Sequence, residues 1–355
     1  MGTDSKLRVV VIGATGNVGT SVVEALGEEP AIGEIVGTAR RPTDLVRPKT
    51  RFVVADTTTD DLRSIVRGAD VVVHLAWLFQ PTHRPEVTWD NNVLGAIRLF
   101  EAVAAEQVPA LVYTSSLAAY SPGPSDRAVS EEWPTHGWPG AAYPREKAYL
   151  ERWLDAFELR HPDTRVVRMR PCFLFKRRSA TEQRRLFAGP LVPGSLVRRG
   201  LIPAVPMTDG LIAQVLHTSD AAAAIVQAVL RPVQGAFNLA TTPAIDGRYL
   251  AELLGARPIP IPRRALRLAT SAAWHLRVLP ASPGLLDTVL ALPLLDSTRA
   301  ETELDWRPRF TPRETLETLL GGLRSGAGLP TAPLAGDSVS RRLHELSTGT
   351  GQRDD

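Results

Sequence analysis

The stretch Leu7–Gly19, LRVVVIGATGNVG, decides the fold. Its first half is a short run of β-branched apolar residues, which is typical of a strand buried on both faces. Its second half places Gly13, Gly16 and Gly19 three residues apart, and apolar residues then continue with helical spacing. A strand that turns sharply into a helix presents unpaired N–H groups and the helix dipole to an anion such as a pyrophosphate. We therefore expect a dinucleotide at this turn.

Each glycine of the turn has an expected use. Gly13 permits the tight turn, Gly16 lets the phosphates approach, and Gly19 lets the helix lie close to the strand. The spacing is G-x-x-G-x-x-G, whereas the usual dinucleotide fingerprint is G-x-G-x-x-G. The other residues of the turn that we expect to contact the cofactor are Thr15, Asn17 and Val18.

The composition is that of an ordinary globular protein. The chain has 355 residues, of which 44% are hydrophobic and 22% charged, and its formal net charge of +3 is too small to indicate a nucleic-acid partner. Cys172 is the only cysteine, so no intrachain disulfide forms. We find neither a signal-peptide pattern nor an apolar run long enough to span a bilayer. The sequence therefore predicts a cytoplasmic protein without a membrane partner, and we assign no metal site.

Strands and helices alternate along the first half of the chain, which predicts a parallel sheet with helices on both faces. We expect an α/β protein: a Rossmann-type doubly wound parallel sheet with a smaller, mainly helical C-terminal substrate lobe. The predicted dinucleotide-binding domain covers 7–175, with 214–240 returning to it. The predicted substrate lobe covers 176–213 and 241–322. The tail 323–355 is rich in Gly, Ser, Pro and charge, and we expect it to be disordered.

The end of the second predicted strand favours NADP over NAD. A fold that prefers NAD places an acidic residue near this point to hold the ribose hydroxyls, and Ala39 stands there instead. Arg40 and Arg41 follow with guanidinium groups suited to a ribose phosphate. A pair of solvated arginines is the alternative interpretation, which leaves NAD open.

Tyr143 and Lys147 stand four residues apart on one face of a predicted helix. A free tyrosine has a pKa of about 10, and a nearby lysine cation lowers that pKa toward the working range of a base. Ser116 ends a predicted parallel strand, at the edge where ligands bind in open α/β sheets, so its hydroxyl can hold a substrate oxygen against the phenol. We predict these three residues to be catalytic. The expected substrate contacts are Trp77, Ser116 and Tyr143.

With these motifs the chain resembles the extended short-chain dehydrogenase/reductase family, the group of NAD-dependent epimerases and dehydratases. The resemblance runs from Leu7 to about Gly322. Besides the glycine turn and the Tyr143/Lys147 pair it rests on His74-Leu75-Ala76, Asn92-Val93, Thr114-Ser115-Ser116, Arg170-Pro171, His217-Thr218-Ser219-Asp220 and Phe237-Asn238-Leu239-Ala240.

The resemblance implies hydride transfer between a nicotinamide and a small secondary alcohol or ketone, with Tyr143 as the acid/base. It also implies further cofactor contacts: Asp56 and Thr57 would meet the adenine, Leu75 and Ala76 would line the cofactor path, Lys147 would hold the nicotinamide ribose, and Pro171 would lie against the nicotinamide. A homodimer through the helices at 92–105 and 143–159 is a family expectation.

The departures from the family bear on the substrate. Leu117-Ala118 stand where dehydratases tend to carry an Asp-Glu pair, and Ala213 stands where epimerases often carry an arginine for the diphosphate. Five other arginines could substitute, although we favour a solvated basic face: Arg177, Arg178, Arg184, Arg198 and Arg199. The alternatives to a reductase are an epimerase with a retained cofactor and a non-catalytic NADP-binding redox sensor.

Overall fold

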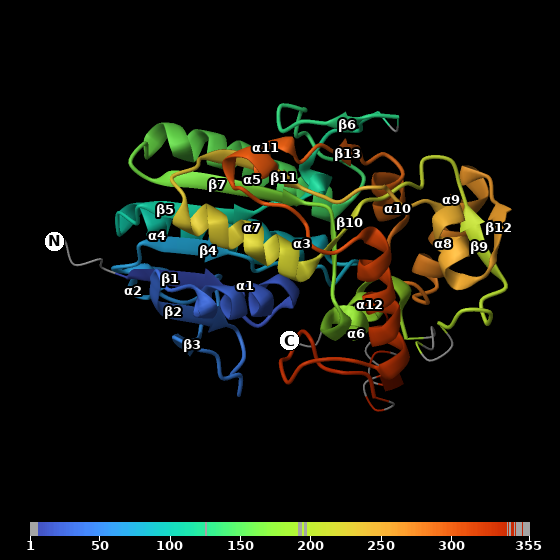
Figure 1. Cartoon of the computed structure of the whole chain (residues 1–355), viewed down its shortest axis with the longest axis horizontal. Helices are drawn as coiled ribbons and strands as arrows, with labels where there is room; N and C mark the ends of the chain where they lie inside the picture. Colours follow the sequence, from blue (N-terminus) through green and yellow to red (C-terminus); the bar gives the residue numbers. More distant parts are fainter. Residues whose placement is uncertain are drawn as a thin grey trace.

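The computed structural model describes residues 6–124, 126–190, 194, 197–338, 340, 342–343, 345 and 350. Its largest element is a seven-stranded parallel sheet in the order β11-β7-β5-β4-β1-β2-β3. The strands are β1 (Leu7–Ile12), β2 (Ile32–Ala39), β3 (Thr50–Val54), β4 (Val71–His74), β5 (Ala110–Thr114), β7 (Arg165–Pro171) and β11 (Gly235–Leu239). Figure 1 shows helices on both sides of the sheet and a second group of helices and short strands at one end of it. The predicted Rossmann-type doubly wound fold is confirmed.

The alternation of side chains along β1 explains why the sheet is covered twice. Val9 and Val11 are fully buried in a core cluster that includes side chains of α1 (Asn17–Glu28) and α7 (Thr218–Leu230). Val10 and Ile12 point the other way, into a cluster with α4 (Gly95–Ala105) and α5 (Ala142–Arg160). Successive side chains of a strand point to opposite faces, so a continuous apolar run needs a helix layer on each.

The order of the strands creates one reversal point. The chain proceeds outward from β1 to β2 and β3, and then returns to place β4 on the other side of β1. In open α/β sheets the connections diverge at such a point and leave a crevice beyond the carboxyl ends of the strands. The short helices α2 (Leu62–Val66) and α3 (Pro85–Trp89) lie in the connections that follow β3 and β4. The crevice therefore opens beyond Ile12 and His74.

A short strand precedes α7. Val215–His217 form the strand β10, which pairs with β8 (Phe173–Phe175). The imidazole Nδ1 of His217 accepts the N–H of Ser219 at 3.3 Å, which caps the first turn of α7.

The second group of elements follows β7. Its short sheets pair β8 with β10, β9 (Ala204–Met207) with β12 (Arg257–Pro260), and β13 (Leu294–Leu295) with β6 (Ala128–Val129). Its helices are α6 (Ala180–Gln183), α8 (Gly247–Leu254), α9 (Arg263–His275), α10 (Pro283–Val289) and α12 (Pro312–Ser325), whereas α11 (Thr298–Glu303) lies beside β11 of the large sheet (Figure 1). Within the described ranges, no helix has the length and apolar character needed to cross a bilayer.

Part of the C-terminal stretch for which the sequence predicts disorder has a defined course. Leu334 is fully buried, and the hydroxyl of Thr331 donates to the backbone carbonyl of Thr15 at 3.0 Å. The backbone N–H of Asp337 donates to the carbonyl of Gly326 at 3.1 Å, which folds the segment back on the end of α12. The polar composition suggested disorder, but one buried leucine and these hydrogen bonds hold residues 326–337 against the glycine turn.

Candidate active site

The glycine turn is shaped by close backbone contacts. Gly13 has a φ of +88°, and a Cβ on it would lie 2.7 Å from the backbone nitrogen of Ala76. A Cβ on Gly19 would collide with the carbonyl oxygen of Gly13, whereas a Cβ on Gly16 would make an ordinary contact with the same oxygen at 3.6 Å. Among the described residues no side chain caps the first turn of α1, and that turn holds no acidic residue. Its N–H groups and dipole therefore suit an anion.

Asn17 and Lys176 tie this turn to the rest of the molecule. The amide of Asn17 donates to the carbonyl of Leu174 and accepts from the hydroxyl of Thr218, each at 3.2 Å. The ammonium of Lys176 donates to the carbonyl of Asn17 at 2.5 Å and to the hydroxyl of Thr20 at 2.6 Å. Burial lowers the pKa of Lys176 to about 8. Lys176 is a residue that sequence reasoning missed, and its being one of only four lysines in the chain was the available signal.

The predicted site residues converge on one cavity of about 1420 Å³. Those that line it are Gly13, Thr15, Gly16, Asn17, Val18, Gly19, Arg40, Arg41, Thr57, Leu75, Ala76, Trp77, Ser116, Tyr143, Lys147 and Pro171. Asp56 is not among the lining residues, and its carboxylate accepts the hydroxyl of Thr58 at 2.7 Å and the backbone N–H of the same residue at 2.8 Å. The adenine contact expected of Asp56 stays a prediction.

Arg40 and Arg41 lie exposed at the carboxyl end of β2, at the edge of this cavity. The guanidinium of Arg40 donates to the side-chain oxygen of Asn91 at 3.0 Å. The hydrogen bond to Asn91 holds the Arg40 guanidinium at the edge of the cavity that the glycine turn also lines. A ribose phosphate bound there would need such a positive charge.

Tyr143 stands in the first turn of α5, and its phenol lies near enough to the Ser116 side chain for that hydroxyl to affect the pKa of the phenol. Two aromatic rings contact the phenol ring: Phe79 at a centroid distance of 4.7 Å and Trp77 at 5.6 Å. These surroundings remove solvent and raise the pKa of Tyr143 to about 12, while Ser116 acts in the opposite direction. The expected lowering of this pKa by a lysine is wrong for the structure as described, because desolvation is the larger effect.

Lys147, one turn further along α5, is almost fully buried. Its ammonium donates to the carbonyl of Thr114 at 2.8 Å and to the hydroxyl of Tyr113 at 3.3 Å. It also lies 3.5 Å from the centre of the Trp77 ring. Burial lowers the pKa of Lys147 well below its ordinary value.

A buried ion-pair network behind the site was missed by sequence reasoning. Glu151, four residues after Lys147, is fully buried. Its carboxylate forms ion pairs with the guanidinium groups of Arg170 (2.8 Å) and Arg168 (3.2 Å) of β7. Ser115 donates to the same carboxylate at 2.6 Å. These charges lower the pKa of Glu151 to about 2 against the opposing effect of burial. The network fixes α5 against β5 and β7, and a glutamate on the face shared with Tyr143 and Lys147 was its sequence signal.

Glu146 forms a second buried contact on the same helix. Its carboxylate accepts the hydroxyl of Thr88 at 2.6 Å and the amide of Asn92 at 2.8 Å. Asn92 also bonds to both the backbone N–H (2.7 Å) and the carbonyl (2.8 Å) of Leu78. The loop after β4, which carries Trp77 and Phe79, is thereby fixed to α5.

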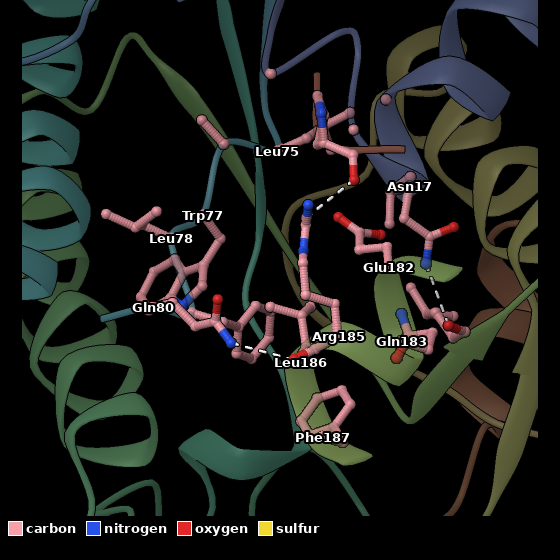
Figure 2. Close-up of a pocket in the computed structure, with 18 of the residues that line it drawn as sticks. Asn17, Leu75, Trp77, Leu78, Gln80, Glu182, Gln183, Arg185, Leu186 and Phe187 are labelled. Atoms are coloured by element: carbon pink, nitrogen blue, oxygen red, sulfur yellow. Dashed lines mark hydrogen bonds between the residues drawn. The ribbon is translucent and has the colours of Figure 1, made fainter. Parts of the chain in front are cut away.

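Figure 2 shows how this loop faces the segment after β8 across the cavity. Trp77, Leu78 and Gln80 come from the loop, and Leu186 and Phe187 lie opposite. The amide of Gln80 donates to the carbonyl of Arg185 at 3.3 Å and links the two sides.

The five arginines proposed as a basic face divide into two groups. Four are exposed, as expected of a solvated face: Arg177, Arg178, Arg198 and Arg199. Arg184 is 4% exposed and pairs with the carboxylate of Glu345 at 2.9 Å, so the interpretation as a solvated residue is wrong for it. In the described part of the chain, no cluster of three or more His, Cys, Asp or Glu side chains could hold a metal ion.

Comparisons with known proteins place the chain among related sequences and folds. The family model described as "NAD dependent epimerase/dehydratase family" matches residues 9–240. An uncharacterized protein of Mycobacterium tuberculosis is 25% identical over 324 residues, which cover 88% of this chain and 83% of that protein. The L-arabinose 1-dehydrogenase (NAD(P)(+)) of Haloferax volcanii is 32% identical over 114 residues, which cover 31% and 41% of the two chains.

Solved structures with a similar fold cover nearly the whole chain. The UDP-glucose 4-epimerase of Thermus thermophilus, in complex with NAD, has a TM-score of 0.68 at 20% identity and covers 90% of this chain and 100% of that one. MoeE5 in complex with UDP-glucuronic acid and NAD has a TM-score of 0.64 at 21% identity, with coverage of 90% and 99%. At these identities the likeness concerns the fold.

Proposed function

Since the chain belongs to the NAD-dependent epimerase/dehydratase family, we propose that it is an NAD(P)-dependent oxidoreductase of the extended short-chain dehydrogenase/reductase type. A bound nicotinamide would supply or accept the hydride that a secondary alcohol and its ketone exchange. The observation that carries the proposal is that Ser116, Tyr143 and Lys147 line the same cavity as the glycine turn.

Tyr143 acts as the acid in the direction of reduction. Its phenol gives a proton to the carbonyl oxygen as the carbonyl carbon gains the hydride, which leaves an alcohol and a phenolate that water reprotonates. The hydroxyl of Ser116 orients that oxygen. Lys147, one turn along the same helix, adds a positive charge that favours the phenolate. Oxidation runs through the same steps in reverse.

The test of this assignment is Tyr143→Phe. The variant keeps the ring but has no proton to transfer, so we expect turnover to be lost while the dissociation constant of the cofactor stays within about twofold. Tyr149→Phe, at an exposed position of the same helix, is the matched control and should keep full activity. An active Tyr143→Phe variant would refute the role of the phenol.

NADP is the cofactor that Arg40 and Arg41 favour. Arg40→Ala removes a cation next to the expected ribose phosphate, so the affinity for NADPH should fall by about tenfold or more and that for NADH by no more than about twofold. Arg51→Ala, which removes an exposed arginine paired with Glu34 on the same edge of the sheet, is the control. Equal losses of affinity for NADPH and NADH in Arg40→Ala would contradict the proposed preference for NADP.

An epimerase is the second candidate, and the structural neighbours that are epimerases in complex with NAD favour it. An epimerase oxidises and then reduces the same carbon with a retained cofactor, so it turns over without net consumption of NADPH, whereas a reductase consumes it. A protein that binds the cofactor and converts no substrate would support the third alternative, a redox sensor. The homodimer and the cytoplasmic location stay predictions, and light scattering tests the former.

A further inference from the structure

We infer that the substrate of this site is an uncharged, largely apolar ketone or secondary alcohol, bound in the part of the cavity between Tyr143 and α10. This inference rests on the function proposed above and narrows its substrate class. It depends on the walls of that part of the cavity, on the contacts that Arg184 and Arg185 already make, and on the carboxylates that pair with Arg184.

The walls are aromatic and aliphatic from the phenol outward. Phe79 contacts Tyr143 at a ring-centroid distance of 4.7 Å, and Phe187 contacts Phe79 at 6.0 Å. Leu286 and Val289 of α10 line the same cavity and are half-buried. Figure 2 shows Phe187 below the side chains of the loop after β4. An apolar substituent on the carbonyl carbon would exchange water for these side chains, which is favourable in proportion to the area buried.

Arg184 and Arg185, which line the cavity and follow the segment that carries Glu182, already have partners. The guanidinium of Arg184 donates to the carbonyl of Gly189 at 2.7 Å and pairs with Glu345 at 2.9 Å and Asp337 at 3.7 Å. The guanidinium of Arg185 donates to the carbonyl of Pro333 at 3.1 Å, a bond drawn in Figure 2. A diphosphate would have to break these contacts before it gained a cation.

Negative charge beside Arg184 also disfavours a nucleotide sugar at this position. The carboxylates of Asp337 and Glu345 line the cavity and already pair with Arg184, and the carboxylate of Glu182 lines the same cavity. A diphosphate would bring about two more negative charges next to them, and like charges in a partly desolvated site repel strongly. Ala213, at the position where a diphosphate arginine is expected, is held by backbone hydrogen bonds to Ile245 and carries only a methyl group.

The experiment uses the full chain, NADPH and the straight-chain methyl ketones from 2-butanone to 2-undecanone, with UDP-glucose as the charged comparison. NADPH oxidation gives kcat/KM, and the change in NADPH fluorescence gives binding of each ketone to the protein–NADPH complex. We expect kcat/KM to rise about three- to fourfold per methylene until the chain fills the apolar wall, as full burial of each methylene predicts. UDP-glucose should be neither converted nor a competitor.

Phe187→Ala tests the wall itself. Because Phe187 lies beyond Phe79, we expect kcat/KM for 2-undecanone to fall about 10- to 100-fold and that for 2-butanone by less than about threefold. Phe310→Ala removes an equally half-buried ring that stacks on His217 outside the cavity, and it should leave the series unchanged. The NADPH dissociation constant should be the same in both variants.

The outcomes separate the substrate class from the proposed function. The apolar substrate class would be overturned by conversion or tight binding of UDP-glucose, by a kcat/KM that does not change along the ketone series, or by no binding of any ketone. If Tyr143→Phe still abolished turnover of whichever substrate reacts, the proposed oxidoreductase function would stand. Binding that strengthens with chain length, without turnover in the unmodified protein, would support the apolar class and refute the oxidoreductase.

Discussion

The ammonium of Lys147 lies 3.5 Å from the centre of the ring of Trp77, a residue of the loop after β4. The carbonyl of Thr114 holds the same nitrogen at 2.8 Å. The negative face of an indole attracts a desolvated cation, so the ring offsets part of the free energy that burial of the lysine costs. The loop after β4 therefore favours the charged form of the lysine as well as lining the cavity.

The contact predicts a specific loss of stability. Trp77→Leu removes the ring face and most of its packing, so the free energy of unfolding in urea should fall by about 2 kcal/mol. Trp77→Phe keeps a ring and should lose about half as much. If the two variants were equally stable, the attraction between ring and ammonium would not contribute.

The raised pKa of Tyr143 predicts different pH dependences for the two directions of reaction. A phenol with a pKa of about 12 stays protonated throughout the neutral range, so kcat/KM for ketone reduction should be flat from pH 6 to 10. Alcohol oxidation needs the phenolate, whose fraction grows with pH below the pKa, so its kcat/KM should rise up to about tenfold per pH unit. A reduction rate that fell around pH 7 would mean that the phenol titrates there.

The parts of the site that are local in sequence were predictable. The three glycines and the Tyr143/Lys147 pair each lie within one turn or one helix, where spacing alone fixes the geometry. The pKa of Tyr143 was not predictable, because it depends on Phe79 and Trp77, which a separate loop brings against the phenol. Long-range contacts of this kind leave no periodic pattern in a single sequence.

Glu151 illustrates a second limit of the sequence. A glutamate on an amphipathic helix is usually a solvated residue, and only the return of β7 reveals that Arg168 and Arg170 surround it. For residues 326–337 of the tail, the course that the structure describes differs from the expected disorder because of one apolar side chain. The polar composition of the tail is typical of disordered segments. The buried side chain of Leu334 anchors residues 326–337, and one leucine hardly changes the composition of the segment.

The network around Glu151 predicts a large effect on stability. Glu151→Gln removes the negative charge and leaves two buried guanidinium groups without it, so the free energy of unfolding should fall by about 3–5 kcal/mol. Arg152→Ala, at the next position, breaks an exposed pair with Asp155 and a hydrogen bond to the carbonyl of Thr135, and should cost no more than about 1 kcal/mol. Similar losses in urea unfolding of the two variants would contradict the structural role of Glu151.

The packing of residues 326–337 against the glycine turn predicts that a substitution there lowers the local stability of this segment without lowering the stability of the whole protein. Leu334 is the buried anchor of the segment, so Leu334→Ala should cost about 2–5 kcal/mol of local stability, while the sheet core keeps its unfolding transition. The amides of Leu329 and Asp337, whose N–H groups bond to the carbonyls of Leu334 and Gly326, should then exchange with solvent at least about thirtyfold faster.

The same change should also reach the cofactor. Because Thr331 bonds to the carbonyl of Thr15 inside the glycine turn, release of the segment uncovers the expected pyrophosphate position, and NADPH should dissociate faster from Leu334→Ala than from the unmodified protein. Leu343→Ala, which truncates an exposed leucine of the same stretch, is the matched control for both measurements. Faster exchange with an unchanged NADPH dissociation rate would show that the segment packs on the turn without covering the cofactor, and unchanged exchange would mean that Leu334 does not anchor it.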